Sequence, residues 1–256
     1  MITRWMPVLA AGLMLIAGCS SSSQPPSPTT VGQQKVVVFA AASLKKTFTA
    51  LGDQFSKDNP GTAVEFSFAG SSDLVTQLTQ GAQADVFASA DAKNMDKAAQ
   101  AGLLAGAPVN FASNTLTIAV APGNPKGINS FQDLTKPGLN VVVCAPQVPC
   151  GSATKTVETT TRVTLNPVSE ESSVTDVLNK VTSGQADAGL VYVTDVATAG
   201  DKVLGVSFPE AAGAVNTYPI ATLAHAGNAA LAGKFVDLVT GPAGQQILTK
   251  AGFGKP

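Results

Sequence analysis

The alternation of apolar strand patterns with helical patterns, which begins at Gln34, constrains the fold of this chain more than any other feature. The run KVVVFA is continuous, apolar and β-branched, as strands buried on both faces of a sheet are. The residues that follow, Leu44–Asp58, place apolar side chains at helical spacing. Because the same succession recurs along the chain, and strands that alternate with helices are typical of α/β proteins, we predict an α/β fold.

Further elements can be placed from the same patterns. We predict strands in TAVEFSFAG, ADVFASA, LTIAVA, LNVVVCAP, ADAGLVYV, KVLGVSFP and VNTYPIATLA. We predict helices over Ser71–Gly81, Lys93–Ala101, Ser152–Thr161 and Ser173–Ser183, a short helix in FQDLTKPG, and two closing helices within Leu231–Leu248. This is about twice the content of a minimal α/β unit. Extended segments near residues 115 and 217 are candidate crossovers between two lobes.

The charge balance excludes several classes of function. The 256 residues are long enough for one large or two small cores, and 16 Lys and Arg face 17 Asp and Glu. A nearly neutral chain without a basic tract argues against a nucleic-acid partner, since such binding depends on phosphate neutralisation. The single histidine, His225, excludes histidine-rich metal sites and paired-histidine acid/base chemistry. In the segment LAHAGN we expect it to be a surface or capping residue.

The N-terminus is typical of an export signal. Arg4 is followed by the apolar run MPVLAAGLMLIAG, which is too short to span a bilayer comfortably. It ends in LIAGC, which resembles a bacterial lipobox and implies cleavage before Cys19 and a lipid on its sulfur. Residues 1–18 are then the signal peptide, and the Ser- and Pro-rich residues 19–34 a flexible tether. We expect a protein anchored to the outer face of the cytoplasmic membrane.

Two cysteines, Cys144 and Cys150, remain once Cys19 is lipidated. An even pair in an oxidising compartment predicts a disulfide. It closes a short loop, CAPQVPC, and contributes about 2 kcal/mol in the chain-entropy model. The spacing does not match the C-x-x-C motif of redox enzymes.

Catalysis finds little support in the sequence. Ser43 follows the first strand, but a nucleophilic serine needs a base, and His225 is the only imidazole. No G-x-S-x-G elbow, phosphate-binding P-loop or G-x-G-x-x-G motif occurs. We therefore predict no catalytic residue and no cofactor.

Binding of an anion is better supported. Small residues and hydroxyls follow several predicted strands or open helices, in VFAAAS, AGSS, PCGSAT and ESSV. The N–H groups of a helix N-terminus are unpaired, and the helix dipole favours negative charge there. Several such termini without a cationic neighbour indicate a neutral site lined by hydrogen-bond donors, suited to an oxyanion.

Four blocks identify a family. VFAAASL, SFAGSS, ADVFASAD and AGLVYVTD, in this order and spacing, resemble the periplasmic molybdate-binding proteins of ABC transporters, and GPAGQQIL and AGF close the chain in the same way. The resemblance runs from about Lys35 to Phe253. It implies the two-lobed type II periplasmic-binding-protein fold, with the ligand in the cleft between lobes. The lobes would be residues 35–115 with 217–256, and residues 116–216.

The resemblance also implies the ligand and its partners. Ser43 and Ser71 would donate hydroxyl and backbone N–H groups, Cys150 and Val174 backbone N–H groups, and Tyr192 its hydroxyl. The ligand would be molybdate, and tungstate with it, so that the metal is bound as an oxyanion and not by direct protein ligands. The expected protein is a monomer that delivers this anion to the membrane permease of an ABC importer.

Two positions depart from the expected pattern. Cys150 stands where a small residue such as alanine is usual in the family, although a backbone donor there does not depend on the side chain. Glu170 and Glu171 lie close in sequence to Val174 and would repel a dianion unless they face solvent.

Other functions stay open at this stage. A protein of the same fold for sulfate or thiosulfate is the nearest alternative. An iron(III)-binding relative is less expected, because that site wants adjacent tyrosines and we infer that Tyr192 and Tyr218 are far apart. A surface-anchored serine hydrolase using Ser43 and a purely structural envelope lipoprotein are the remaining alternatives.

Overall fold

The computed structural model describes residues 34–256. The expected signal peptide, the lipidation site Cys19 and nearly all of the expected tether lie outside the described residues. None of the helices in the described part of the chain is both long enough and apolar enough to cross a membrane.

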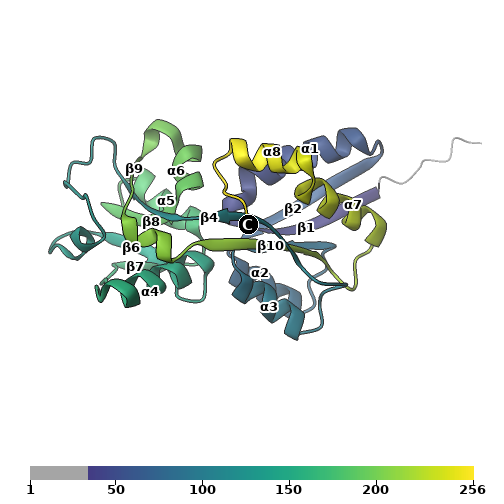
Figure 1. The fold of residues 1–256 in the computed structure, drawn as a ribbon, viewed down its shortest axis with the longest axis horizontal. Coiled ribbons are helices and arrows are strands. Elements are labelled where there is room, and N and C mark those ends of the chain that lie inside the picture. Colours follow the sequence, from purple (N-terminus) through teal and green to yellow (C-terminus); the bar gives the residue numbers. More distant parts are fainter. Residues whose placement is uncertain (1–33) are drawn as a thin grey trace, which may run out of the picture. The chain divides into compact units, whose positions relative to one another are not determined.

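The described chain forms two sheets of five strands each, flanked by helices (Figure 1). The first sheet has the order β2-β1-β3-β10-β4, in which β1 runs parallel to β2 and β3, whereas β10 runs antiparallel to β3 and β4. Its strands are β1 (Gln34–Ala41), β2 (Thr62–Ala69), β3 (Val86–Ala88), β10 (Asn216–Thr222) and β4 (Val109–Asn114).

The second sheet repeats this pattern, with the order β7-β6-β8-β5-β9. Here β6 is parallel to β7 and β8, and β5 is antiparallel to β8 and β9. Its strands are β7 (Ser169–Glu171), β6 (Val141–Cys144), β8 (Ala188–Tyr192), β5 (Leu116–Val120) and β9 (Leu204–Val206). Each sheet with its helices is called a lobe below, the first lobe being the one that contains β1.

Helices cover both faces of each sheet. The first lobe contains η1 (Ala42–Leu44), α1 (Lys45–Asp58), α2 (Ser71–Thr79), α3 (Ala92–Gln100), α7 (Ala229–Thr240) and α8 (Pro242–Lys250). The second contains η2 (Gln132–Thr135), α4 (Pro149–Thr161), α5 (Val174–Thr182), α6 (Val193–Ala199), η3 (Gly200–Lys202) and η4 (Pro209–Gly213). In Figure 1, α2 and α3 lie on one face of the first sheet, and α1, α7 and α8 on the other.

Strand periodicity separates the first lobe's core into two layers. Side chains of successive strand residues point to opposite faces, so Val36 and Val38 pack with α1, α7 and α8, whereas Val37 and Phe39 pack with α2 and α3. The second lobe has one continuous core, rich in valine.

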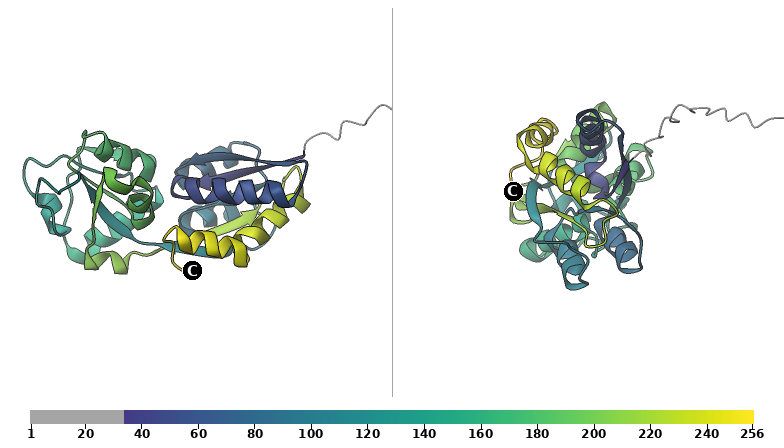
Figure 2. Two further views of the ribbon diagram at one scale, coloured as in Figure 1. Left: turned by 90° about the horizontal axis from the view of Figure 1, so that it is seen from above. Right: turned by 90° about the vertical axis from the view of Figure 1, so that its right-hand side faces the viewer.

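The chain passes twice between the lobes. One passage runs from β4 to β5 through Thr115, and the other leads from β9 to β10. The two passages lie side by side, because Asn216 of β10 pairs with Asn114 of β4 (Figure 2). The predicted α/β fold with two lobes is therefore confirmed.

Most predicted elements form near their predicted positions. The predicted helix Leu44–Asp58 corresponds to α1 with its preceding turn, and its four core-facing side chains are fully buried: Leu44, Phe48, Leu51 and Phe55. The predicted helix Ser152–Thr161 begins three residues earlier, since Pro149 occupies the first helical position, where its missing N–H is not needed. Strands β4 and β7 and helix α6 were not predicted, because each is short or lacks a clear period.

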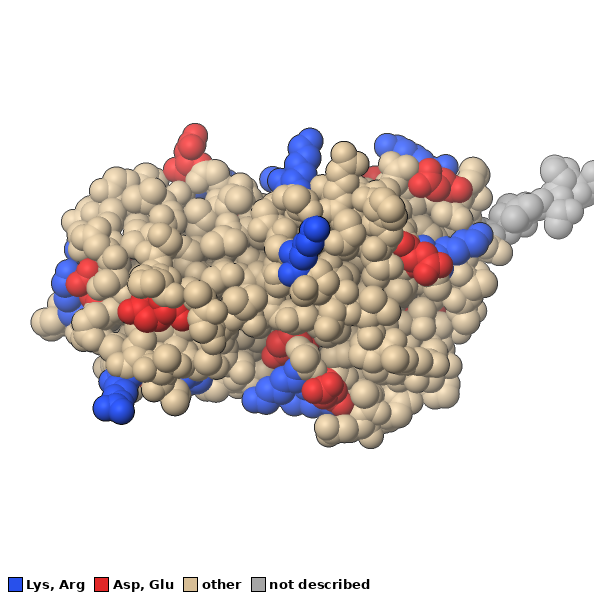
Figure 3. Space-filling view, viewed as in Figure 1, with Lys and Arg blue, Asp and Glu red and all other residues tan. Residues whose placement is uncertain are grey.

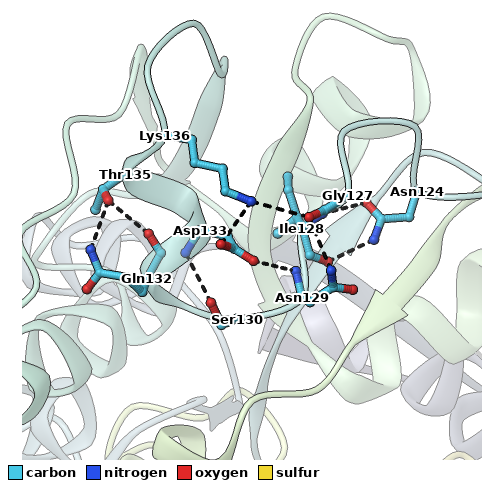
Figure 4. Close-up of polar contacts among 9 residues, drawn as sticks. All are labelled: Asn124, Gly127, Ile128, Asn129, Ser130, Gln132, Asp133, Thr135 and Lys136. Atoms are coloured by element: carbon cyan, nitrogen blue, oxygen red, sulfur yellow. Dashed lines mark hydrogen bonds and ion pairs between the residues drawn. The ribbon is translucent and has the colours of Figure 1, made fainter.

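The connection from β5 to β6 is ordered by its own polar contacts (Figure 4). The side chain of Asn124 bonds both the N–H and the carbonyl of Ile128, at 3.0 and 2.8 Å. Asp133 accepts from the N–H of Asn129 at 2.8 Å and pairs with Lys136 at 2.9 Å. The hydrogen bond from Asn129, with the contacts of Lys136, holds the pKa of Asp133 below its usual value. This loop therefore has a defined conformation far from any strand end of the first lobe.

Candidate ligand-binding site

The carboxyl ends of β1 and β2 in the first lobe meet those of β6, β7 and β8 in the second. At or just after these strand ends, in the same order, stand Ser43, Ser71, Cys150, Val174 and Tyr192. All five line one small cavity, together with Ala41, Ala42, Gly70, Ala90, Val148 and Pro149. The space open to the centre of a water molecule is about 10 Å³, which is close to the minimum for one water molecule. The structure thus brings together every residue that the sequence predicts for the site.

The hydroxyl of Ser43 lies 3.0 Å from that of Tyr218 on β10. Asn114 donates to the hydroxyl of Thr194 at 2.8 Å and, more weakly, to that of Tyr218 at 3.4 Å. Where the hydroxyl of Tyr218 donates to Ser43, the O–H of Ser43 is left free to donate into the cavity. In that arrangement the first lobe presents Ser43 as a donor, and no base touches it.

Ser71 is oriented by a backbone group. It is the first residue of α2 and is 1% exposed, and its hydroxyl oxygen accepts from the N–H of Ala90 at 3.0 Å. Since the oxygen is engaged as an acceptor, the O–H group remains to donate into the cavity that Ser71 and Ala90 both line.

The second lobe contributes the first turns of two helices. Cys150 is the second residue of α4 and Val174 the first residue of α5, positions at which a backbone N–H has no partner inside its helix. A disulfide joins Cys150 to Cys144 at the end of β6. A side chain at Gly151 would collide with the carbonyl oxygens of Cys144 and Ala145, so this glycine lets the first turn of α4 rest against the strand end.

Tyr192 holds a buried hydroxyl that no described protein atom satisfies. The side chain is 1% exposed, and burial raises its pKa well above the usual value, so the hydroxyl keeps its proton and acts as a donor. A buried donor without a partner costs free energy. Because Tyr192 lines the cavity, this donor is available to a guest there.

The inference that Tyr192 and Tyr218 are far apart was wrong. Their rings lie 6.1 Å apart in an edge-to-face contact, because the antiparallel strand β10 brings Tyr218 to the passage between lobes. Burial raises the pKa of Tyr218 as well, although its hydrogen bond with Ser43 acts in the opposite direction. No group of three or more His, Cys, Asp or Glu side chains gathers within residues 34–256 in a way that could hold a metal ion.

The cavity wall itself carries no charged side chain among the described residues. Glu170 is exposed, and Glu171 forms an ion pair with Lys180 and accepts from Ser169 at 2.7 Å. Burial raises the pKa of Glu171, but the hydrogen bonds of Lys180 and Ser169 and the charge of Lys180 outweigh it, and the pKa is lowered. The charge of Glu171 is thus neutralised at the edge strand. On the face drawn in Figure 3, charged side chains stand singly or in small groups among uncharged residues.

Two amide side chains from the first lobe hold the disulfide loop of the second. Asn94 of α3 donates to the carbonyl of Gln147 at 3.3 Å, and Asn216 donates to the carbonyls of Ala90 and Pro149 at 2.9 and 3.4 Å. These contacts bring the loop that precedes Cys150 against the first lobe. No sequence signal pointed to Asn94, Asn216 or Tyr218, because their roles arise from contacts between segments distant in the chain.

A larger hollow, of about 430 Å³, lies at the amino end of β1 and is lined by Asp85 and His225 among others. The carboxylate of Asp85 is already used there, since it accepts from the N–H groups of Val37 and Gly227 at 2.7 and 2.6 Å. His225 is exposed, as expected, and lies at the opposite end of β1 from Ser43. The one carboxylate of this hollow is therefore engaged within the fold.

Two α/β lobes with a small cavity between them, lined by hydrogen-bond donors and free of charged side chains, define a solute-binding protein of the two-lobed type. The chain belongs to the family of bacterial extracellular solute-binding proteins, whose family model matches residues 36–254. It is 64% identical over 218 residues to the molybdate-binding protein ModA of Mycobacterium tuberculosis, covering 85% of this chain and 84% of that protein.

Two further relatives agree with this assignment. The molybdate-binding protein ModA of Escherichia coli is 32% identical over 228 residues, covering 84% of this chain and 87% of that protein. The solved periplasmic molybdate-binding protein of Azotobacter vinelandii superposes with a TM-score of 0.73 at 26% identity, covering 86% of this chain and 99% of that one.

Proposed function

We propose that this protein captures molybdate, and tungstate with it, between its two lobes and delivers the anion to the permease of an ABC importer. One observation carries the proposal: the donors of Ser43, Ser71, Cys150, Val174 and Tyr192 surround a single small cavity whose wall has no charged side chain. The similarity to proteins named for molybdate binding supports the same ligand.

Hydrogen bonds alone suffice for tight binding. A hydrogen bond to a charged group contributes about 1.5–3 kcal/mol net. The seven hydroxyl and N–H donors of the proposed set would contribute on the order of 10–20 kcal/mol before lobe closure is subtracted. Micromolar to nanomolar affinity corresponds to about 8–12 kcal/mol, so the site needs no lysine or arginine.

The same donors discriminate among anions. Phosphate near neutral pH retains a proton and requires an acceptor in the site, whereas molybdate, tungstate and sulfate carry no proton. The oxygen of the Ser71 hydroxyl is already engaged as an acceptor, and the Ser43 hydroxyl lies within hydrogen-bond distance of the Tyr218 hydroxyl. We therefore place phosphate outside the ligand class and assign discrimination between molybdate and sulfate to the size of the cavity.

Binding, and not catalysis, is the proposed activity. A serine hydrolase would need a base at Ser43, but its hydrogen-bond partner is the hydroxyl of Tyr218, whose pKa is raised by burial. We propose further that the protein is a monomer. It is exported and is anchored by a lipid on Cys19 to the outer face of the cytoplasmic membrane. Labelling of cells with a fatty-acid analogue should mark the wild type and leave a Cys19→Ala variant unmarked.

Isothermal titration calorimetry of the purified domain tests the function. Molybdate and tungstate should bind with submicromolar dissociation constants and equal stoichiometry of one, while phosphate releases no heat. Strong binding of sulfate or thiosulfate together with silence toward molybdate would assign the protein to the neighbouring ligand class. Absence of binding by every oxyanion would favour a purely structural lipoprotein.

A further inference from the structure

Two helices with the same place in their lobes begin differently. Each lobe has three parallel strands, and each of these helices follows the second of them along the chain: α2 follows β2, and α5 follows β7. Helix α5 has Ser173 as its N-cap, whose hydroxyl accepts from the N–H of Asp176. Helix α2 has Gly70 at the equivalent position, where no side chain caps the helix. Since serine is a better N-cap than glycine, the first lobe forgoes some helix stability at this residue.

The backbone of Gly70 does not explain the choice of glycine. Its φ of −60° and ψ of 140° are open to any residue. Its carbonyl accepts from the N–H groups of Asp73 and Leu74 at 3.0 Å, as in an ordinary first turn. Another constraint must therefore exclude a side chain.

That constraint comes from the second lobe. A Cβ atom at Gly70 would overlap the carbonyl oxygen of Ser172, and would lie 3.6 Å from Cγ1 of Val148. Backbone atoms such as this carbonyl cannot move aside as the end of a flexible side chain can. Ser172 and Val148 each stand two residues before a proposed donor, Val174 and Cys150 respectively. The approach at Gly70 thus governs how near both second-lobe donors come to the cavity.

We propose that Gly70 is a positioning residue that sets the closure distance of the two lobes, because only a residue without a side chain lets the Ser172 carbonyl approach. The inference rests on the proposed function, since closure matters through the ligand held between the lobes. A side chain at residue 70 would keep the N–H groups of Val174 and Cys150 away from an anion that still contacts Ser43 and Ser71. Hydrogen bonds weaken steeply with such displacement.

Gly70→Ser is the sharpest test, because it separates closure from folding. A serine there restores an N-cap, so the ligand-free protein should melt at the same temperature as the wild type or higher. Its affinity for molybdate should nevertheless fall by at least about tenfold, and that of Gly70→Val by more. A structural defect would lower both quantities together. The matched control is Gly106→Ser, also in the first lobe, where a Cβ would meet no atom within 4 Å.

Two measurements decide the outcome. Calorimetry gives the dissociation constant for molybdate, and small-angle X-ray scattering gives the contraction of the protein when molybdate is added. The wild type and Gly106→Ser should bind tightly and contract, and Gly70→Ser should bind weakly and contract less. Equal affinity and equal contraction in Gly70→Ser would overturn the role of Gly70. Failure of the wild type itself to bind would instead overturn the proposed function.

Discussion

The two lobes share one strand order but build their halves of the site by different means. The first lobe offers serine hydroxyls whose oxygens are engaged by Tyr218 and Ala90, so that their direction depends on hydrogen bonds. The second lobe offers backbone N–H groups at helix starts, one of which is tied to its strand by a disulfide. The comparison shows that one topology can aim donors either through side-chain networks or through covalently restrained backbone.

The hydrophobic cores of the two lobes also differ in composition. Aromatic rings cluster in the first lobe, where Phe48 contacts Phe66, Phe111 and Phe235 with centroids 5.8–6.4 Å apart. The second lobe packs mostly aliphatic side chains, valine above all, with Phe131 and Phe208 as its one aromatic pair among the described residues. Large rings fill the space between the first sheet and three helices, whereas branched side chains fill most of the second core.

The largest expected effect tests the first lobe's side-chain donors. Replacing Ser43 and Ser71 together by alanine should weaken molybdate binding by about 10²–10⁴-fold, because two hydrogen bonds to an anion are lost at about 1.5–3 kcal/mol each. Calorimetry measures the loss. Lys46→Ala is the control, since this exposed residue of α1 should change affinity little. Undiminished binding in the double variant would show that the two serine hydroxyls are not needed to hold the anion.

A second effect concerns the acid–base behaviour of the second lobe. Burial raises the pKa of Asp195 to about 7, although its carboxylate accepts from the N–H of Tyr192 at 2.9 Å. Above pH 3.8, the usual pKa of an aspartate, the unfolded chain has released the proton of Asp195, whereas the folded protein still holds it. The contribution of Asp195 to the free energy of unfolding is therefore greatest below pH 3.8. The free energy of unfolding should fall as the pH rises from about 4 to about 7, by an amount on the order of a few kcal/mol.

Asp195→Asn removes this titration and keeps an oxygen that can accept from Tyr192. Urea unfolding from pH 4 to pH 8 should therefore show a smaller decline in the variant than in the wild type, and the variant should be the more stable of the two at pH 8. Parallel profiles would mean that Asp195 is not the residue that makes the second lobe sensitive to pH.

A third effect tests whether the buried hydroxyl of Tyr192, which has no protein partner, donates a hydrogen bond to the ligand. Tyr192→Phe removes a buried group without a protein partner, so the ligand-free protein should be as stable as the wild type or more so, by up to about 1 kcal/mol. The same change should weaken molybdate binding by about tenfold or more. Tyr218→Phe provides the contrast, because that hydroxyl has partners in Ser43 and Asn114 and its loss should lower stability. Melting curves with and without molybdate separate the two variants.

The smallest effect tests the covalent restraint of the second lobe. Replacing Cys144 and Cys150 by serine should lower the free energy of unfolding by about 2 kcal/mol, since the disulfide closes a short loop. Affinity for molybdate should fall by less than when Ser43 and Ser71 are replaced by alanine. Asn94 and Asn216 still hold the loop through its carbonyls. A larger loss of affinity than of stability would show that the disulfide itself aims the N–H of Cys150.

Several parts of the site were predictable because they follow local rules. Ser43, Ser71 and Val174 stand where a strand passes into a helix, and the donors of a helix start can be recognised from neighbouring residues. Cys150 lies in PCGSAT, which the same rule marks, whereas Tyr192 was added by the family resemblance alone. Glycine at residue 70 looked like one more small residue in AGSS, because its constraint comes from Ser172, about a hundred residues later in the chain.

By itself, the sequence determined the α/β class, most helices and strands, and the electrically neutral character of the site, since these follow from periodicity and composition. Tertiary structure decided what the donors touch. It placed Tyr218 beside Tyr192 and Ser43, and it brought Asn94 and Asn216 onto the disulfide loop. The physical reason is that the crossing strands β5 and β10 each join the sheet of the lobe they enter. Contacts between such distant segments are governed by sheet register and lobe approach, which no single stretch of residues encodes.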